Sequence, residues 1–526
     1  MTYTVNSDRL GTLRGLEVRA KNSQSSIYYF GGIPYALPPL DQWRFRRPRP
    51  LPKEHRYDGS FTGQTSVCPQ PEWRGTRKEE LWNEDCLQLN IYIPVGTPPP
   101  KGWPVFFYIH GGFLQWGDPN MAPEDIVPLL TETPFQCTIV QPAYRVNAFG
   151  FLASQELQEE AEVDGQFAGN MGFWDQRLAL EWTYEAIGEF GGDRNNITVG
   201  GYSAGSHSTF QQLAYELYYA PPEKEIIKRV IMWSNSPGIQ PKGLKEQQKQ
   251  FDELLSTLDI PLSSTASEKL RRLREAPARD IINAQDKMTI TEFRATTDNS
   301  FVSEESIANI NSGDFARRMQ SRGIWLMNGE CQDEHNLYRA WRTSENSYDG
   351  VYVRLCADYP EAIVRKLMQY YVGTSRALPS GYTSWQDLFG HAYAGLQVYF
   401  LERGFHNNLA PLLRPGKELL RYRIEWRAEC SDYPPEWGVT HATDMVIWFW
   451  SPGLTDQDKK ILQPWNESFA KFVKGEDVEW GTETLTERRR LRNDGHTDIL
   501  ELDERWEEGL HIWKLLNEDA ITETHL

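Results

Sequence analysis

Residues 197–205 read ITVGGYSAG, and SHSTFQQLAYELY follows at 206–218. The apolar run at its start predicts a strand, and the segment after it has helical character. Between them, residues 201–205 form a G-x-S-x-G pentapeptide, which in a strand–turn–helix context is typical of a nucleophile elbow. The glycines are needed because such a tight turn leaves no room for Cβ atoms. We therefore expect Ser203 to be a nucleophile, with an ordinary surface turn as the alternative.

Apolar runs with strand character recur on both sides of this motif. The clearest are LQLNIYIP, VFFYI, CTIV, VIMW and IWLM, which start at residues 87, 105, 137, 230 and 324. YRIEW at 422–426 is a weaker candidate. Helical spacing separates the runs, as in 175–190. Strands that alternate with helices predict an α/β fold whose sheet is parallel or mixed and is covered on both faces.

The chain has 526 residues, and at about 150 residues per domain this length suggests three or four domains. However, no internal repeat or linker divides it. The charged, helical-looking stretches at about 240–320 and 360–420 have no repeat of their own. We therefore predict a single domain over residues 1–526, in which these two stretches are helical insertions. Residues 499–516 predict a terminal helix packed on its own domain, with a dimer helix as the alternative.

The composition excludes several classes of partner. Lys and Arg number 55 and Asp and Glu number 73, so the formal net charge is −18. An acidic chain repels phosphate backbones, which argues against nucleic acid. No apolar run approaches the roughly 20 residues of a membrane helix. The N-terminus lacks the apolar core of a signal peptide, so we expect a cytoplasmic protein, or a secreted one if a leader was removed.

The cysteines and histidines show no pattern of metal ligands. Six cysteines lie at positions 68, 86, 137, 331, 356 and 430. There is no CxxC pair, no Cys/His cluster at zinc spacing and no HExxH motif. We therefore expect no metal site and no cofactor.

A second glycine motif follows the strand predicted at 105–109. It reads HGGF at 110–113. An HGG-type loop after a strand supplies backbone N–H donors for an oxyanion, and glycine leaves these amides unobstructed. The N–H group of Ala204, directly after the candidate nucleophile, is a further donor. The alternative is an ordinary Gly-Gly turn.

Long motifs extend the pattern well beyond the pentapeptide. They are FGGDRNNITVGGYSAG at 190–205, EDCLQLN at 84–90, GNMGFWDQRLALEW at 169–182 and AYRVNAFGFL at 143–152. From about residue 8 to about residue 450 the chain resembles the type-B carboxylesterase and cholinesterase-like family of α/β-hydrolases. The resemblance implies an α/β-hydrolase fold, with a large, mixed but mostly parallel sheet flanked by helices. Helical insertions would form a cap over the site.

The resemblance implies an acidic member of a catalytic triad. The family has a glutamate in a D-E-G element after a strand, and this chain has DEH after the strand predicted at 324–327. This match assigns the role to Glu334, with His335 where the family has glycine. Asp333 and Glu330 are rival acids.

The triad's base is implied in the same way. The family's G-x-x-H block matches GVTH at 438–441 and points to His441. His207, on the helix after Ser203, points the wrong way for a base. The resulting order of Ser203, Glu334 and His441 is that of α/β-hydrolases.

The resemblance also bears on the oxyanion donors and the pocket. It aligns Gly111 and Gly112 with the last two of the three glycines that many relatives carry. Cholinesterases have an acidic residue just before the nucleophile, where this chain has Tyr202, which argues against a choline ester. Tyr202, Phe113 and Trp233 are candidate pocket walls, with core packing as the alternative for each.

The family closes a loop with a disulfide at positions that correspond to Cys68 and Cys86. The resemblance therefore implies this bond. A loop of this size would contribute about 3 kcal/mol of stability. We expect the bond to form in the purified protein.

The implied activity is hydrolysis of a small-molecule carboxylic ester through an acyl-enzyme. One alternative on the same scaffold is an acyltransferase, or an enzyme that forms or opens lactones. Another is a non-catalytic binding protein, which the presence of all three triad residues disfavours. We expect a monomer or a homodimer.

Overall fold

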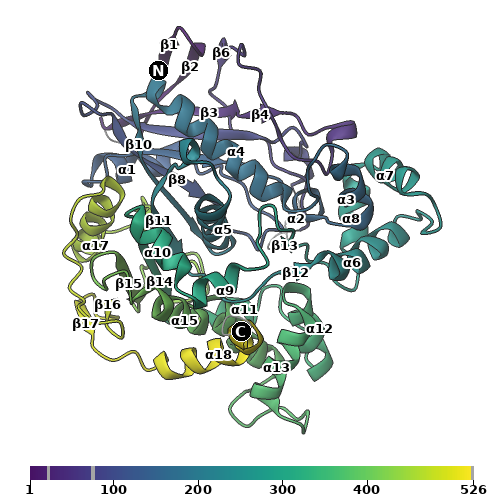
Figure 1. The fold of residues 1–526 in the computed structure, drawn as a ribbon. Coiled ribbons are helices and arrows are strands. Elements are labelled where there is room, and N and C mark those ends of the chain that lie inside the picture. Colours follow the sequence, from purple (N-terminus) through teal and green to yellow (C-terminus); the bar gives the residue numbers. More distant parts are fainter. Residues whose placement is uncertain (21–23, 73–77, 523–526) are drawn as a thin grey trace.

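The computed structural model describes residues 1–20, 24–72 and 78–522 (Figure 1). Within these residues, the main sheet has 13 strands in the order β1-β2-β3-β7-β9-β8-β10-β11-β14-β15-β16-β17, with β6 paired to β2. The strands are β1 (Thr2–Ser7), β2 (Gly11–Arg19), β3 (Ser26–Pro34), β6 (Gly59–Ser60), β7 (Gln88–Pro94), β8 (Trp103–Ile109), β9 (Thr138–Pro142), β10 (Gly192–Tyr202), β11 (Ile227–Trp233), β14 (Trp325–Cys331), β15 (Leu419–Ile424), β16 (Arg488–Leu491) and β17 (Thr497–Leu500).

The centre of the sheet is parallel and its edges are antiparallel. Strands β9, β8, β10, β11, β14, β15 and β16 run parallel to one another. Strands β1, β2, β3 and β7 form one antiparallel edge and β17 forms the other. This arrangement confirms the predicted mixed, mostly parallel sheet. Because the carboxyl ends of parallel strands meet at one edge, the segments that follow β8, β10 and β14 converge there.

Each face of the sheet has its own hydrophobic core. Val105, Phe107 and Ile109 of β8 belong to one core, and the alternating residues Phe106 and Tyr108 belong to the other. Helices α4 (Met171–Ala186) and α5 (Ala204–Tyr218) cover the first face, and α1 (Pro123–Thr131) and α17 (Asp456–Lys474) cover the second. The strands are buried on both faces, which is why they appear in the sequence as nearly continuous apolar runs.

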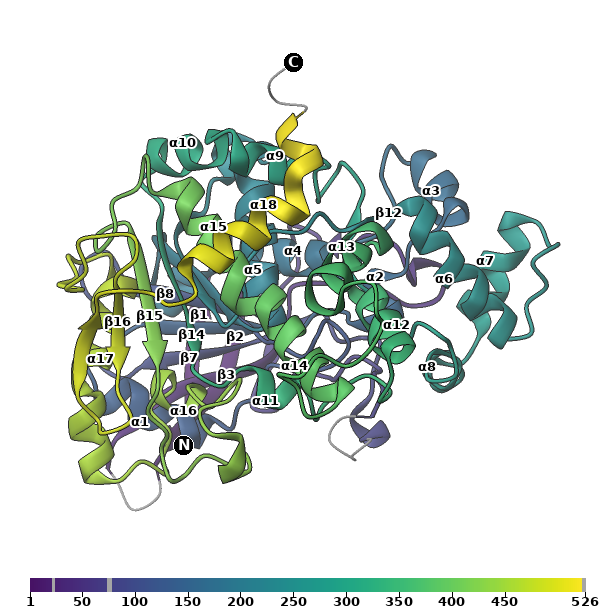
Figure 2. The same cartoon turned by 90° about the horizontal axis from the view of Figure 1, so that it is seen from below.

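Helices occupy both stretches predicted as insertions. The first stretch contains α6 (Leu244–Thr257), α7 (Ala266–Glu275), α8 (Ala278–Gln285), α9 (Ser306–Asn311) and α10 (Asp314–Ser321). The second region contains α12 (Tyr348–Asp358), α13 (Glu361–Val372), α14 (Trp385–Ala394), the π-helical turn η5 (Gly395–Tyr399) and α15 (Phe400–Leu409). In both views α6, α7, α12 and α13 lie to one side of the sheet, whereas α10 packs against α5 and α15 over one face of it (Figures 1 and 2). Smaller helices between the strands and insertions include α2 (Asn147–Phe151), α3 (Gln155–Glu162), α11 (His335–Tyr338) and α16 (Met445–Trp448).

The C-terminal helix α18 (Trp506–Thr522) packs on the same chain, against α15 (Figure 2). A methyl group on Gly404 would lie 2.3 Å from the Trp513 ring, so this ring packs directly against the backbone of α15. None of the helices in the described part of the chain is both long enough and apolar enough to cross a membrane.

Candidate active site

Ser203 lies on a strained turn between β10 and α5, as the pentapeptide predicts. Its φ angle is +58°, in a region that residues with a side chain rarely adopt. A Cβ atom on Gly201 would lie 2.3 Å from the Gly205 carbonyl carbon, and one on Gly205 would lie 2.0 Å from the Ile109 carbonyl oxygen. Only glycine fits these two positions, so the motif allows the serine to project from the carboxyl end of β10.

The loop after β8 brings the candidate oxyanion donors to the same place. A Cβ atom on Gly111 would lie 3.1 Å from Cβ of Ser203, so these two backbones are in close contact. Gly112 has a φ of +112°, and a Cβ atom there would lie 2.0 Å from the Trp116 carbonyl oxygen. Gly111, Gly112 and Ser203 line one cavity. Ala204 begins α5, so its N–H group belongs to the unpaired first turn of that helix.

Glu334 and His441 are brought together by segments that are far apart in the sequence. His441 Nδ1 lies 2.5 Å from Glu334 Oε2, and both side chains are buried. The second carboxylate oxygen of Glu334 accepts hydrogen bonds from the Ser234 hydroxyl at 2.7 Å and the Cys331 N–H at 2.8 Å. The carboxylate is therefore fixed in position and holds one nitrogen of the imidazole.

The rival acids have other partners. Asp333 accepts a hydrogen bond from the Val439 N–H group at 3.0 Å. Glu330 forms an ion pair with Arg403 at 2.6 Å. Among the described residues neither forms a hydrogen bond to His441, so the geometry favours Glu334.

Tyr338 contacts the imidazole and was missed by sequence reasoning. Its hydroxyl lies 3.1 Å from both ring nitrogens of His441. The Tyr202 ring lies on the same imidazole, with ring centroids 4.8 Å apart. Within the described residues, Ser203 Oγ makes no hydrogen bond to His441, and catalytic hydrogen bonds in unliganded enzymes often tighten only when substrate binds. A sequence signal did exist, because Tyr338 follows Glu334 by four residues, which is one helical turn.

Two cavities meet at Ser203, and Phe113 lines both. The first, called here the His441 cavity, has a volume of about 200 Å³. It is lined by His441, Tyr202, Leu337, Trp341 and Tyr433, together with the two glycines of the candidate oxyanion loop. The second, called here the Gln211 cavity, has a volume of about 100 Å³. Its lining includes His207 and Gln211 of α5, Ser236, Gln240 and Arg294.

The chain is similar to known proteins along nearly its whole length. Residues 2–510 match the Carboxylesterase family. The chain belongs to this family. It is 52% identical to a carboxylic ester hydrolase of Gibberella moniliformis, over 98% of this chain and 96% of that one. It is 30% identical to the para-nitrobenzyl esterase of Bacillus subtilis, over 90% of both chains. The fold matches that of Aspergillus niger EstA with a TM-score of 0.74, at 21% identity and 99% coverage of both chains.

These matches identify the chain as a carboxylic ester hydrolase with the predicted α/β-hydrolase fold. Two of the three predicted pocket residues of this carboxylesterase, Phe113 and Tyr202, line the cavities. The third, Trp233, does not, and its prediction as a pocket wall was wrong. Trp233 ends β11 with its ring fully buried on the opposite face of the sheet, stacked on Trp448 at a centroid distance of 5.4 Å.

The predicted disulfide is also absent. Cys68 and Cys86 are free thiols, and both are buried in the core. The Cys86 thiol has a hydrogen bond to Cys68, and this bond together with burial raises the pKa of Cys86 well above its ordinary value. A thiol in such surroundings remains protonated and unreactive. The loop between them is held instead by an ion pair between Arg44 and Glu84 at 2.5 Å.

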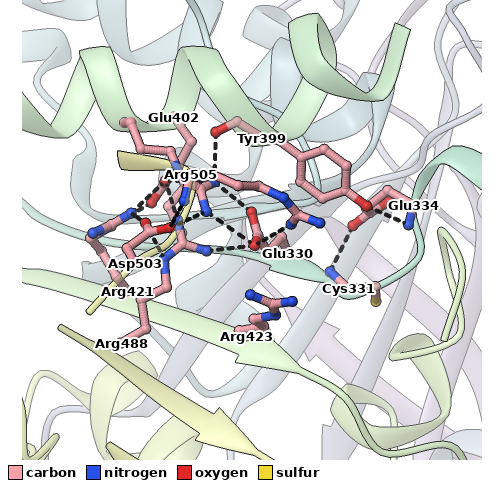
Figure 3. Close-up of polar contacts among 12 residues, drawn as sticks. Glu330, Cys331, Glu334, Tyr399, Glu402, Arg421, Arg423, Arg488, Asp503 and Arg505 are labelled. Atoms are coloured by element: carbon pink, nitrogen blue, oxygen red, sulfur yellow. Dashed lines mark hydrogen bonds and ion pairs between the residues drawn. The ribbon is translucent and has the colours of Figure 1, made fainter. Parts of the chain in front are cut away.

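A buried cluster of alternating charges lies beside the strand end that leads to Glu334 (Figure 3). We call it the arginine network, and its members are Glu330, Glu402, Arg403, Arg421, Arg488 and Asp503. Each carboxylate pairs with at least two arginines, at 2.5–2.9 Å. Burial alone would raise the pKa of Glu402, but Arg421 and Arg488 hold it at about 2.

Tyr399 connects the arginine network to the candidate triad (Figure 3). Its hydroxyl accepts a hydrogen bond from the Glu334 N–H group at 2.8 Å and donates one to the Gln332 carbonyl oxygen at 2.8 Å. Arg403 donates to the Tyr399 carbonyl oxygen at 2.5 Å, and the Arg505 guanidinium lies 3.9 Å from the Tyr399 ring centroid. Tyr399 therefore links the backbone of Glu334 to Arg403 of the arginine network.

Asp444 is a second buried carboxyl group near the imidazole. Burial raises the pKa of Asp444 from its ordinary 3.8 to about 6, and the charge of Glu334 adds to this rise. The Trp448 indole N–H donates to one of its oxygens at 2.8 Å, while the other oxygen has no partner among the described residues. A carboxyl group with a raised pKa in the folded state favours folding when it is protonated, and this contribution is lost as pH rises from 3.8 through 6.

We therefore expect Asp444→Asn to stabilise the protein at neutral pH. Below about pH 4 the variant and the wild type should unfold with similar free energies. Above pH 7 the variant should be more stable by up to about 3 kcal/mol, because two pKa units correspond to roughly that energy. Urea unfolding of both proteins at a series of pH values measures the difference. A difference that does not change between pH 4 and pH 7 would contradict the raised pKa.

Proposed function

We propose that this carboxylic ester hydrolase is a serine esterase in which Ser203, His441 and Glu334 form the catalytic triad. His441 takes the proton from Ser203 as the serine oxygen attacks the ester carbonyl. Glu334 holds the imidazole in the required orientation and stabilises its charged form. His441 then protonates the leaving alcohol, and water hydrolyses the acyl-enzyme by the same steps.

The oxyanion of the tetrahedral intermediate is assigned to the N–H groups of Gly111, Gly112 and Ala204. Each lies in a backbone segment that borders Ser203. Fixed donors of this kind stabilise charge that develops only in the transition state, and each is worth about 2.7–4 kcal/mol.

One observation carries the proposal. His441, which lies 2.5 Å from the buried Glu334 carboxylate, lines the same cavity as a serine held at a positive φ angle. A histidine with only a structural role does not require both a buried carboxylate at one ring nitrogen and a strained serine in the cavity that it lines. This combination is what nucleophilic catalysis requires.

The two cavities receive different parts of the ester. The leaving alcohol must be within reach of His441, which protonates it, and His441 lines only the His441 cavity. The acyl group stays on Ser203 after the alcohol has left. We therefore assign the alcohol to the His441 cavity and the acyl group to the Gln211 cavity.

Labelling with a serine-directed fluorophosphonate tests the proposal. We expect wild-type protein to be labelled at one site, at a rate that a competing ester lowers, because the reagent needs an activated serine. The Ser203→Ala variant should not be labelled. A wild-type protein that resists the reagent, or a variant that is labelled equally well, would refute the assignment and favour a non-catalytic binding protein.

A further inference from the structure

Helix α5 directs a row of polar side chains into the Gln211 cavity. His207 and Gln211 of α5 are spaced four residues apart and so share one face of the helix, and Ser203 lies on the turn four residues before His207. All three line the cavity. Residues at one and two helical turns from a nucleophile would normally be apolar if the pocket received only a hydrocarbon chain. The polar face therefore bears on which acyl group fits there.

Several residues that line this cavity carry a buried polar atom with no partner among the described residues. Gln211 is only 3% exposed, yet its side-chain oxygen forms no hydrogen bond with any of the described residues. The same holds for the hydroxyl of Ser236, which is 5% exposed, and for the side-chain oxygen of Gln240. The Gln240 amide nitrogen donates to Thr297 and Ser303, at 2.8 and 2.9 Å, and this fixes the orientation of its free oxygen.

Unpaired buried polar atoms are costly, by about 1–3 kcal/mol each. A hydrocarbon chain in the cavity would leave the cost unrelieved. A ligand that donates hydrogen bonds would remove it, since two of the three atoms are amide oxygens that can only accept.

The charges around the cavity are already neutralised. Arg294 forms ion pairs with Glu292, at 3.1 Å, and with Asp358. Burial, together with the charge of Arg294, lowers the pKa of His207 to about 4, so the imidazole is neutral at physiological pH. The cavity therefore offers hydrogen bonds without offering a net charge to a ligand.

We propose that the Gln211 cavity selects an uncharged acyl group that carries a hydrogen-bond donor, such as a hydroxyl, over a plain alkyl acyl group. The selection rests on the proposed function, because it requires an acyl-enzyme at Ser203. Gln211 and Ser236 are its specificity-determining residues. The donor of the substrate completes the hydrogen bonding that the folded protein leaves open.

A pair of isosteric esters tests the selection. The 4-nitrophenyl esters of 3-hydroxybutanoate and 3-methylbutanoate differ only by a hydroxyl in place of a methyl group. We expect the wild type to hydrolyse the hydroxylated ester with a kcat/KM at least about fivefold higher, as one net hydrogen bond would give. In Gln211→Leu the preference should reverse, and in Ser236→Ala it should weaken.

The ratio of the two kcat/KM values is independent of the fraction of active protein, so a partly misfolded variant still gives a valid result. Gln212→Leu is the matched control, because Gln212 neighbours Gln211 but bonds to the Phe173 carbonyl oxygen and does not line the cavity. Its ratio should equal that of the wild type. A wild type that prefers 3-methylbutanoate, or a Gln211→Leu ratio that is unchanged, would overturn the selection while leaving ester hydrolysis intact. If neither ester is hydrolysed at all, the proposed function fails and the selection fails with it.

Discussion

Replacing Ser203 by alanine is expected to lower kcat for ester hydrolysis about 10⁶-fold, which is the loss found when a hydrolase triad loses its nucleophile. The variant retains the proposed oxyanion donors and both cavities, so a residual rate well above that of water should remain. His441→Ala should cost nearly as much, because the serine hydroxyl is a weak nucleophile without its base. The double variant should be hardly slower than either single variant, since the two residues act as a unit.

Initial rates with a 4-nitrophenyl ester, at enzyme concentrations high enough to detect the slow variants, measure these losses. Glu334→Gln should lower kcat less, by about 10⁴-fold, because a neutral amide no longer fixes the tautomer of His441. Asp333→Asn is the matched control, since Asp333 bonds to the Val439 backbone and not to the imidazole. If Asp333→Asn is impaired as severely as Glu334→Gln, the assignment of the acid is wrong. Losses that multiply in the Ser203 and His441 double variant would rule out a shared role.

The parts of the site that could be predicted from sequence are those that depend on local geometry. The turn at Ser203 needs glycine at 201 and 205 because backbone atoms lie within 2.3 Å of where their Cβ atoms would be. The glycines after β8 lie on a similarly crowded loop. Because both loops follow parallel strands, their meeting at one edge of the sheet also follows from the predicted fold.

Contacts between distant segments could not be predicted in this way. Tyr399 reaches the backbone of Glu334 from a helical turn 65 residues further along the chain, whose packing no local pattern defines. Trp233 was predicted as a pocket wall, but an aromatic residue at a strand end can face either side of the sheet. Its ring lies in the core on the face opposite the core that contains Phe113.

The edges of the sheet were also missed. The three N-terminal strands and the hairpin formed by β16 and β17 are short or partly exposed, so they lack the continuous apolar runs that reveal buried parallel strands. The arginine network was missed for a related reason. Five of its charged residues lie on β14, β15, β16 and α15, and Asp503 lies between β17 and α18. From the sequence alone, charged residues are expected at the surface.

We expect this network to keep the acid of the proposed triad in place. Glu330 lies four residues before Glu334 in the sequence, and Asp503 lies three residues before the start of α18. Arg403 connects the two, at 2.6 Å and 2.9 Å. The last strands and the terminal helix are thereby connected to the strand that positions the proposed catalytic carboxylate.

We therefore expect Arg403→Met to lower the free energy of unfolding by about 3–5 kcal/mol. The substitution leaves two buried carboxylates with one fewer cation, and breaking a buried ion pair from one side has a cost of this size. Arg403→Lys should lose less than methionine but should not match the wild type, because an ammonium group cannot form the paired bonds of a guanidinium. Urea unfolding followed by tryptophan fluorescence measures both losses.

The matched control is Arg492→Met, which removes an ion pair with Asp494 in which both side chains are more than 40% exposed. Exposed pairs contribute about 0–1 kcal/mol, so this variant should unfold almost as the wild type does. Lowering the pH should also reduce the stability that the network contributes, as Arg403→Met does. Because Glu402 has a lowered pKa of about 2, the stability it contributes is present above its ordinary pKa and is lost as pH falls through 2. If Arg403→Met is no more destabilised than Arg492→Met, the network does not hold β14 in place, and the position of Glu334 must depend on Ser234, Cys331 and Tyr399 alone.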